Sequence, residues 1–386
     1  MNERILNAED APAVLAEWEI ERGGRIGVIT LNVPKTLNSL TLEMIDAMDA
    51  QLRAWAEAPE VVAVYLRGAG ERAFCAGGDI QALYRSMVAN HEAGELVDRY
   101  AETFFEHEYR LDHRIHVYPK PVVCFGHGVV MGGGLGILSA ASHRVVTESS
   151  RVAMPEITIG LFPDAGGTTL LSSMPGHFGL FLGLTGAQIN GADAVEVGLG
   201  RFLLRTEARE SLERGLLEAR WHGDAEQDRA MLDVLLGNLD AEAREARPAP
   251  QAGPLRRTID EALAEADGDY TAAINGVRKL RGHGGWIDRA VDTMEAGCPV
   301  TAGIVVEQLR RAKDLSLADR FRMEMVIGTH CARNRDFAEG VRALLIDKDR
   351  SPQWSVEGLD ALSPKTVQAH FEPPWDENPL ADLRDP

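Results

Sequence analysis

Two apolar runs that each end in a cluster of glycines constrain the fold of this chain most strongly. The run at residues 61–66 leads to Gly77 and Gly78, and a second run at residues 121–125 leads to the triplet at residues 132–134. Short apolar runs are typical of buried strands, and glycine lets the chain turn sharply after each one. Repetition of this pattern predicts an α/β structure in which strands alternate with helices.

Hydrophobic periodicity over the first half of the chain supports the same α/β arrangement. A helix predicted to begin at Thr41 places apolar residues at three- to four-residue spacing as far as Trp55. Alternation of such helices with strands indicates layers joined by crossovers. The predicted strands are residues 25–31, 61–67, 121–126 and 143–147, and further helices are predicted at residues 95–116 and 133–141.

The second half of the chain changes in character to charged helical segments. We therefore predict a core at residues 12–205 and a mostly helical C-terminal region at residues 206–386. A proline-rich stretch at residues 247–254 is the predicted connection within this region, and the tail at residues 371–379 holds too many prolines for regular structure. Helices are predicted at residues 255–266, 270–282, 284–296, 301–313 and 319–334.

Length, charge and cysteine content bound the class of protein. The 386 residues, 45% of them hydrophobic, suffice for a substantial core. An acidic N-terminus, the absence of an apolar run of about 18 residues and four separated cysteines predict a cytoplasmic protein with buried, reduced thiols that neither enters a membrane nor is exported. A formal charge of −19 argues against nucleic-acid binding, which needs a basic face to displace phosphate counterions.

One segment rich in proline and glycine carries two carboxylates on constrained backbone. Pro155 and Pro163 fix φ immediately before Glu156 and Asp164, and glycines follow each acid. One interpretation is that the backbone aims both carboxylates for chemistry. The other is that these are ordinary turn dipeptides, with Asp164 capping a helix that begins near Gly166. The segment by itself leaves both interpretations open.

Four motifs follow one another in a characteristic order along the chain. They are Phe-Cys-Ala-Gly-Gly-Asp at residues 74–79, Gly-Gly-Gly at 132–134, Met-Pro-Glu at 154–156 and Pro-Asp-Ala-Gly-Gly at 163–167. This set resembles the crotonase (enoyl-CoA hydratase/isomerase) superfamily, whose members bind acyl-CoA thioesters. The string at residues 336–349, followed by Trp354, is most similar to the branch that hydrolyses 3-hydroxyisobutyryl-CoA in valine catabolism. The resemblance spans residues 25–354.

This resemblance implies a fold and roles for five residues. The implied fold is the crotonase-like ββα superhelix with a C-terminal helical region. Backbone N–H groups of Gly78 and Gly133 are implied to form an oxyanion hole for the thioester carbonyl, and Gly133 is also predicted to begin a helix, whose dipole favours an anion. Glu156 is the implied catalytic carboxylate. Asp164 is implied to orient water or protonate the departing thiolate, and Glu108 to bind the acyl hydroxyl.

The same motifs keep two other superfamily activities open. Hydratases carry a second glutamate two residues after the glycine triplet, where this chain has Gly136. Adding water across a double bond needs two carboxylates on opposite sides of one water, so efficient hydratase activity is not expected. An enoyl-CoA isomerase needs only one glutamate and is the alternative together with the hydratase. A non-catalytic acyl-CoA-binding protein is an alternative of another class, against which Glu156 and Asp164 argue.

Two further patterns are weaker indications of a cofactor. His107, His113 and His116 include a pair spaced for zinc, but no matching cysteine or carboxylate set follows. The glycines between Gly126 and Gly132 imitate a dinucleotide fingerprint, but their spacing is Gly-x-Gly-x-x-x-Gly. We therefore predict no metal and no cofactor, with CoA being part of the substrate.

The implied partner is an acyl-CoA substrate, which is itself a polyanion. Binding it needs local positive groups on an acidic chain. In the superfamily, C-terminal helices cover the acyl pocket and build subunit contacts, so a homo-oligomer is compatible with the resemblance, while nucleic acid and membrane are not expected partners. Early basic candidates for the CoA phosphates are Arg22, Arg25, Lys35, Arg67 and Arg72.

Overall fold

The computed structural model describes residues 3–21 and 23–385 of the chain. The chain divides into two units made of interleaved segments, so neither unit is one continuous stretch of sequence. This division cuts the chain differently from the core at residues 12–205 and the region at 206–386 defined above. The first unit comprises Met1–Gly78, Leu111–Val152 and Ile189–Pro250, and the second comprises Asp79–Arg110, Ala153–Gln188 and Gln251–Pro386.

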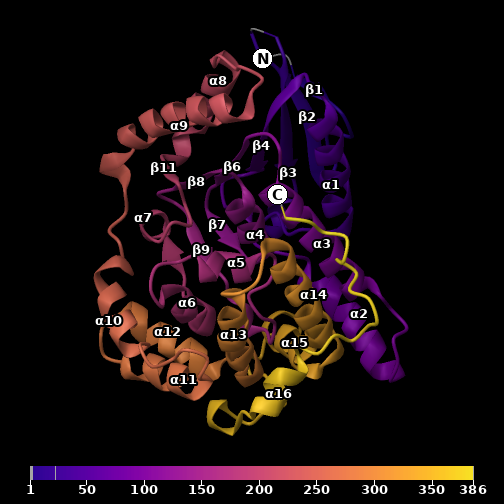
Figure 1. The fold of residues 1–386 in the computed structure, drawn as a ribbon, viewed down its shortest axis with the longest axis vertical. Helices are drawn as coiled ribbons and strands as arrows, with labels where there is room; N and C mark the ends of the chain where they lie inside the picture. Colours follow the sequence, from indigo (N-terminus) through magenta and orange to yellow (C-terminus); the bar gives the residue numbers. More distant parts are fainter. Residues whose placement is uncertain (1–2, 22, 386) are drawn as a thin grey trace. The chain divides into compact units, whose positions relative to one another are not determined.

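A seven-stranded sheet forms the frame of the first unit (Figure 1). In spatial order its strands are β1 (Glu3–Ile5), β2 (Ala13–Glu19), β3 (Arg25–Leu31), β4 (Val61–Gly68), β6 (Val122–Gly126), β8 (His143–Thr147) and β11 (Phe202–Leu204). The first three strands pair antiparallel, and β3 through β11 pair parallel. Parallel neighbours require crossover connections, and some of these place a helix of the same unit against the sheet.

Helices cover both faces of this sheet. On one face, α8 (Arg209–Glu218) and α9 (Ala225–Glu242) join a core that includes Trp18, Tyr65 and Phe125. The helix α1 (Leu42–Glu57) lies on the other face, which Gly27 of β3 faces because successive residues of a strand point to opposite sides. A Cβ on Gly27 would lie 2.5 Å from the ring of Trp55 in α1. The predicted start of α1 is confirmed, because the Thr41 side chain accepts the N–H of Met44 as an N-cap.

A smaller four-stranded sheet in the first unit carries the glycine turns. Its order is β10 (Ile189–Asn190), β9 (Arg151–Ala153), β7 (Val129–Met131) and β5 (Ala73–Cys75). The helix α4 (Gly133–Ala140) follows β7 directly, as the sequence predicted. The remaining short elements of this unit are α7 (Gly191–Glu196) and three single turns, η1 (Pro34–Thr36), η3 (Thr206–Ala208) and η4 (Arg244–Ala246).

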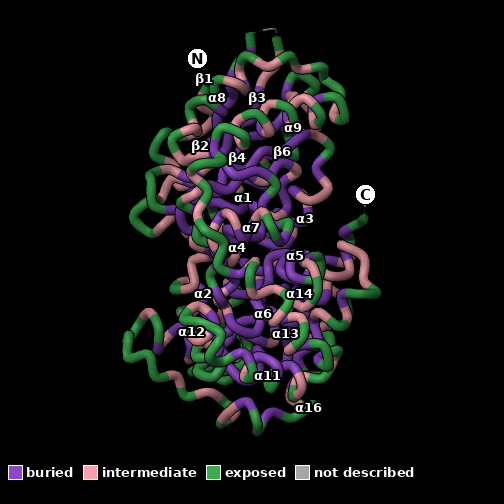
Figure 2. The backbone as a smooth tube through the Cα atoms, turned by 90° about the vertical axis from the view of Figure 1, so that its left-hand side faces the viewer, coloured by how far each residue is buried: buried purple, intermediate pink, exposed green. Residues whose placement is uncertain are grey.

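Helices make up the second unit, and α13 is its central one. The longer helices are α2 (Ile80–Ala93), α3 (Tyr100–His116, as far as Arg110), α12 (Gly285–Ala296), α13 (Pro299–Ala312) and α14 (Leu317–Arg333). The shorter ones are α5 (Gly167–Ser172), α6 (Phe178–Thr185), α10 (Arg256–Ala262), α11 (Tyr270–Lys279), α15 (Arg335–Val341), α16 (Pro364–Ala369), η2 (Glu156–Thr158), η5 (Gly253–Leu255), η6 (Arg342–Ile346) and η7 (Leu359–Ala361). Nearly all of α13 is buried, and it packs against α5, α6, α11 and α16 (Figures 1 and 2).

Most predicted helices are confirmed, with shifted ends that have physical reasons. The predicted helix at residues 301–313 begins at Pro299, because proline at the first helical position has a suitable fixed φ. The predicted helix at residues 95–116 begins only at Tyr100. The turn before it is held by Asn90, whose Oδ1 accepts the N–H groups of Val97 and Asp98. Several described elements, β2 and α2 among them, were not predicted.

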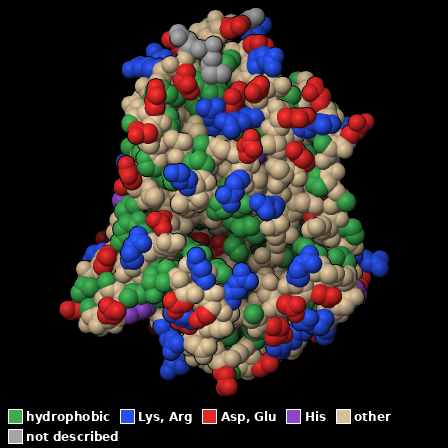
Figure 3. Space-filling model, turned by 180° about the vertical axis from the view of Figure 1, so that it is seen from behind, with side chains coloured by type: hydrophobic (Ala, Val, Ile, Leu, Met, Phe, Trp, Pro, Cys, Tyr) green, Lys and Arg blue, Asp and Glu red, His purple; other side chains and the backbone are tan. Residues whose placement is uncertain are grey.

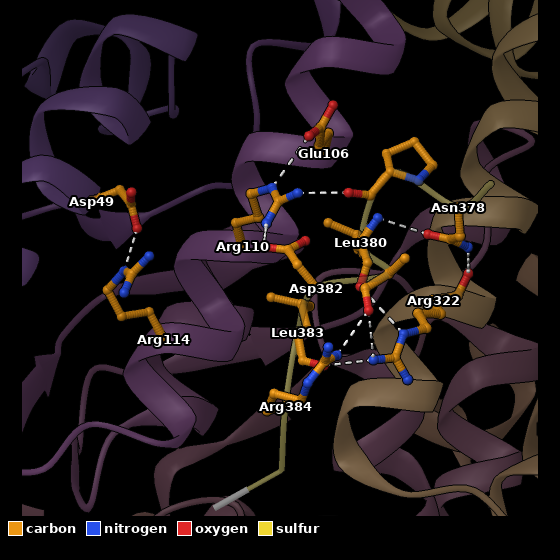
Figure 4. Close-up of polar contacts among 12 residues, drawn as sticks. Asp49, Glu106, Arg110, Arg114, Arg322, Asn378, Leu380, Asp382, Leu383 and Arg384 are labelled. Carbon is orange, nitrogen blue, oxygen red and sulfur yellow. Dashed lines mark hydrogen bonds and ion pairs between the residues drawn. The ribbon is translucent and has the colours of Figure 1, made fainter.

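The C-terminal segment crosses two helices of the second unit as an irregular strap, which we define as residues 378–385 (Figure 4). Arg110 of α3 donates to the carbonyl of Pro379 at 2.5 Å and to Asp382 at 2.9 Å. Arg322 of α14 donates to the carbonyls of Leu380 at 3.2 Å and Leu383 at 2.6 Å. The strap therefore ties α3 to α14 through two arginines, although it has no regular structure of its own.

The surface carries both signs of charge despite the net charge of −19. Figure 3 shows acidic and basic side chains interspersed over one face of the molecule. Many of them pair, as Arg278 does with Glu295 and Asp360. Among the described residues, no helix is both long enough and apolar enough to cross a membrane.

Candidate active site

Three predicted site carboxylates come together inside the second unit. Glu108 lies on α3, Glu156 begins the single turn η2, and Asp164 lies in the loop before α5. Their side chains are only 3%, 4% and 4% exposed. Burial of one carboxylate needs a partner, and burial of three near one another is costly unless protons are shared among them. Their burial shows that the segment around Glu156 and Asp164 is not a pair of surface turns.

The backbone around Asp164 is strained and therefore held by its surroundings. Ala165 has φ 51° and Gly166 has φ 81°, so two consecutive residues adopt the left-handed conformation. Glycine adopts this conformation freely, whereas for alanine it costs about 1–2 kcal/mol of free energy. Asp164 itself closes the turn, because its carbonyl accepts the N–H of Gly167 at 2.7 Å. Such strain persists only where neighbouring contacts determine the geometry.

Two buried side chains supply those contacts. Glu324 of α14 accepts the N–H of Gly166 on Oε2 at 2.9 Å and the N–H of Thr168 on Oε1 at 2.8 Å. Gln308 of α13 donates through Nε2 to the carbonyl of Pro163 at 2.8 Å and to the Thr168 hydroxyl at 2.6 Å. Both side chains are fully buried. The loop that carries Asp164 is thus held on each side of that residue.

The side chain of Asp164 is held separately, from α3. The Tyr109 hydroxyl donates to Asp164 Oδ2 at 2.8 Å, and Tyr109 is completely buried in a group of aromatic rings that includes Phe105 and Phe321. Because Tyr109 follows Glu108 directly in α3, one helix turn supplies both a site carboxyl and the donor that orients another.

The protonation of the cluster is set by burial and by mutual repulsion. Burial raises the pKa of Glu108 well above its usual range, and the carboxylates of Asp164, Glu156 and Glu324 raise it further. Burial, with a contribution from Asp164, also raises the pKa of Glu156 well above normal. Burial raises the pKa of Asp164 to about 7, although the hydrogen bond from Tyr109 opposes the rise. The cluster therefore holds protons at neutral pH that isolated carboxylates would have lost.

Glu324 belongs to the same electrostatic group. Burial raises the pKa of Glu324 to about 7, and the bonds from Thr168 and Gly166 oppose this rise. Its two oxygens are engaged by backbone N–H groups, whereas Oε1 of Glu108 and Oε2 of Glu156 have no hydrogen-bond partner in the described part of the chain. Buried polar atoms are rarely left unpaired, so these two oxygens are the ones suited to contact a substrate.

The predicted oxyanion-hole residues belong to the first unit. Gly133 begins α4, and Gly78 forms a bridge with Leu40 at the end of the segment that contains Gly77. A Cβ built on Gly77 would lie 3.6 Å from the Gly133 nitrogen, so the two glycine-rich segments are neighbours. Gly134 is needed for this close approach, because a Cβ there would lie 2.4 Å from the Cys75 carbonyl oxygen.

The interior of α4 bears on which reaction is possible. Gly136, at the position where the hydratases of the superfamily carry their second glutamate, is buried within the helix. Its neighbours in α4 from Gly133 to Leu138 are all buried and none is acidic. The helix therefore offers backbone N–H groups at its start but no carboxylate.

The predicted basic residues have varied surroundings. Arg25 pairs with Glu17 and Glu60, and Arg67 pairs with Glu213 while stacking over the Trp18 ring. Lys35 and Arg72 are exposed, and Arg22 lies outside the described residues.

Sequence reasoning missed Tyr109, Gln308 and Glu324. Their contacts with the Asp164 loop bridge 55, 145 and 158 positions of sequence, and no local spacing reports such distances. The sequence around Glu324 does indicate a buried role. Glu324 is the one acid between Met323 and Gly328 in an otherwise apolar helical stretch. A lone carboxylate on an apolar helix face is a candidate for a buried role.

Comparison with known proteins gives a consistent set of relatives. The sequence model described as enoyl-CoA hydratase/isomerase matches residues 26–371. A curated relative from Danio rerio, 3-hydroxyisobutyryl-CoA hydrolase, mitochondrial, is 36% identical over 365 residues, which cover 92% of this chain and 89% of the relative.

Two solved structures share the fold over almost the whole chain. A carnitinyl-CoA dehydratase from Mycobacterium thermoresistibile has a TM-score of 0.81 and 33% identity, with 98% of this chain and 100% of that chain covered. An enoyl-CoA hydratase from Rhodobacter sphaeroides 2.4.1 has a TM-score of 0.78 and 32% identity, with 94% and 98% covered. The predicted crotonase fold is confirmed by these matches.

Proposed function

We propose that this chain hydrolyses the thioester bond of 3-hydroxyisobutyryl-CoA, since it belongs to the enoyl-CoA hydratase/isomerase family. The products are 3-hydroxyisobutyrate and CoA, as in valine catabolism. The observation that carries the proposal is the buried group of Glu108, Glu156 and Asp164, in which Glu108 and Glu156 each keep one oxygen without a partner. Curated relatives named as hydrolases of this ester support the same substrate.

Glu156 is the proposed catalytic carboxylate. As a nucleophile it attacks the thioester carbonyl, forming a mixed anhydride and releasing CoA, and water then cleaves the anhydride. As a general base it removes a proton from the attacking water instead. Both routes need the ionised carboxylate. Burial raises the pKa of Glu156, so its ionised form is harder to reach than that of an isolated glutamate.

Asp164 is the proposed partner for the leaving group or the water. Its pKa of about 7 lets it both carry and release a proton near neutral pH. In its protonated form it can give a proton to the departing CoA thiolate, and in its ionised form it can orient water. The Tyr109 hydrogen bond at 2.8 Å keeps its carboxyl group in one orientation for either role.

Glu108 is the proposed specificity residue. Its Oε1 is buried and unpartnered, and a carboxyl group there can accept a hydrogen bond from the hydroxyl of a 3-hydroxyacyl group. A site built around a substrate hydroxyl discriminates strongly against analogues that lack it, because the buried polar group is then left unpaired.

The proposed oxyanion hole rests on the family resemblance, and the proposed location rests on the acidic N-terminus and the separated cysteines of the chain. Backbone N–H groups at Gly78 and Gly133 are proposed to stabilise the negative charge that develops on the thioester oxygen. No cofactor or metal is proposed, a cytoplasmic location is proposed, and assembly into a homo-oligomer is compatible with the chain. Cell fractionation and a rate measured with and without chelator test the location and the metal independence.

The hydratase alternative is disfavoured by one position. Water addition to an enoyl-CoA uses two carboxylates, and α4 offers Gly136 where the second one would stand.

Release of free thiol from a panel of acyl-CoA esters tests the proposal. CoASH should appear fastest from 3-hydroxyisobutyryl-CoA or 3-hydroxypropionyl-CoA. Brisk hydration of crotonyl-CoA without thiol release from any 3-hydroxyacyl ester would show that the chain is a hydratase instead. Binding of these esters without turnover would favour an acyl-CoA-binding protein.

A further inference from the structure

We propose that Glu324 is a positioning residue that holds the Asp164 loop in its working geometry and tunes the charge of the carboxylate cluster. This inference rests on the proposed hydrolase function and adds a residue to it. Glu324 lies on α14, far along the chain from the predicted catalytic motifs, and contacts the Asp164 loop through both carboxylate oxygens.

Engagement of both oxygens separates Glu324 from the substrate-facing carboxyls. Its Oε2 accepts the Gly166 N–H and its Oε1 accepts the Thr168 N–H, at 2.9 and 2.8 Å. Glu108 and Glu156 each keep one buried oxygen unpartnered. Glu108 and Glu156 therefore have oxygens available to a substrate, whereas both oxygens of Glu324 accept backbone N–H groups.

The hydrogen bonds to Glu324 lie at the part of the loop where the backbone is strained. Ala165 and Gly166 are both left-handed, and Asp164 immediately precedes them. Glu324 fixes the N–H of Gly166, while Gln308 holds the Pro163 carbonyl on the other side of Asp164. Loss of the Glu324 bonds would let the strained pair relax and would carry the Asp164 carboxyl with it.

Burying a carboxylate to accept two backbone N–H groups costs more free energy than burying a neutral side chain that does the same. Neutral Ser or Asn side chains cap helices well, and α5 has only six residues. A fully buried carboxylate costs more than such a cap, especially beside other acids. The choice of Glu is accounted for if its charge contributes to the reaction as well as its hydrogen bonds.

The charge of Glu324 interacts with other members of the carboxylate cluster, Asp164 among them. It is one of the carboxylates that raise the pKa of Glu108, and it also raises the pKa of Tyr109, the donor to Asp164. Arg320 is the cationic group of α14 that interacts with it. The titratable and charged groups around Asp164 and Glu324 are Glu108 and Tyr109 of α3, Glu156 of η2, and Arg320 and Cys331 of α14.

The test compares Glu324→Gln with a matched control, Asp228→Asn. Asp228 is also buried and also accepts two backbone N–H groups, from His222 at 2.7 Å and Gly223 at 3.1 Å, but it belongs to the first unit and not to the carboxylate cluster. Rates of CoASH release from 3-hydroxyisobutyryl-CoA are measured from pH 5 to 9, with a melting curve for each variant.

Glu324→Gln should lower kcat by about tenfold or more while KM stays within about twofold, because the loop moves but ester binding persists. Removal of one negative charge should also move the acid limb of the pH profile to lower pH by roughly one unit. Asp228→Asn should lower thermal stability only. If Glu324→Gln behaves like Asp228→Asn, with kcat and pH profile unchanged, the proposal is wrong.

A second variant keeps the test decisive if Glu324→Gln does not fold. Gln308→Met removes the bonds to Pro163 and Thr168 without changing charge. It should lower kcat with an unshifted pH profile, and an unchanged kcat would overturn the loop-positioning role. Failure of the hydrolase proposal is distinct from either result, because the unmodified protein would then release no CoASH.

Discussion

Glu213 of the first unit and the carboxylate cluster of the second unit are buried in opposite ways. In the first unit, Glu213 accepts from Arg67 at 2.8 Å, from Arg209 at 2.9 Å and from the Tyr65 hydroxyl at 3.2 Å. In the second unit, the charged neighbours that shift the pKa of Glu108 are all carboxylates. Arginines balance the charge of a paired carboxylate, whereas a cluster of like charges destabilises the fold and holds protons near neutral pH. The contrast separates a structural site from a chemical one.

The largest expected effect is the loss of activity in Glu156→Gln. Both proposed mechanisms need a carboxylate at the thioester carbonyl, so turnover should fall by at least about a thousandfold while CoA esters still bind. Thiol release and ester binding by calorimetry measure the two properties. Glu307→Gln is the control, because Glu307 is buried to a similar degree but pairs with Arg310 and Arg311. Near-normal turnover in Glu156→Gln would transfer the catalytic role to Asp164.

Single turnover in ¹⁸O-water separates the two mechanisms for Glu156. Label enters the Glu156 side chain if it forms an anhydride and water attacks the enzyme-side carbonyl. A general base acquires no label. Label found in Glu156 therefore rules out the purely general-base route.

The first unit should respond to the loss of a carboxylate in stability instead. Glu213→Gln leaves Arg67 and Arg209 without their shared anion, so the free energy of unfolding should fall by about 2–3 kcal/mol. Denaturant unfolding measures this loss. The kcat of the folded fraction should not change. A large drop in kcat at full folding would mean that the role of Glu213 is not only structural.

Glu108→Ala should produce a smaller and more selective effect. If Glu108 binds the acyl hydroxyl, 3-hydroxyacyl esters should slow by about ten- to a hundredfold and esters without that hydroxyl should be spared. Glu106→Ala, two residues earlier on the same helix, is the control because Glu106 pairs with Arg110. Equal losses on both classes of ester would leave Glu108 with a structural role only.

The smallest expected effect is a change in how stability depends on pH. The folded pKa of Asp164 is about 7 against an ordinary value of 3.8, so between these values the folded state keeps a proton that the unfolded state has lost. Stability from this group is therefore lost as pH rises toward 7. Asp164→Asn removes this loss. The Tm at pH 8 minus the Tm at pH 5 should therefore be higher by roughly 2 °C in Asp164→Asn than in the unmodified protein. An equal change at both pH values would contradict the shifted pKa.

Sequence alone predicted four strands of the larger sheet (β3, β4, β6 and β8), several of the helices and the carboxylates Glu156 and Asp164, because each depends on local periodicity or on a contiguous motif. Glu108 could be predicted only through the family resemblance, since an acid on a helix is usually a surface charge. Tyr109 and Glu324 could not be predicted, because their roles exist only once α3, α14 and the Asp164 loop pack together. Interleaving of the two units follows from the same long-range packing.

The strap at residues 378–385 sets an order of events during protein synthesis. Arg110 and its partner Asp382 are 272 positions apart, and at about 5–20 residues per second the ribosome needs roughly 15–55 s to make the second after the first. Throughout that interval α3 lacks its last tether, and the buried aromatic face around Tyr109 lacks Phe321 for most of it. The helix that carries Glu108 is thus made long before its last contacts can form, and until then its apolar face around Tyr109 lacks part of its cover.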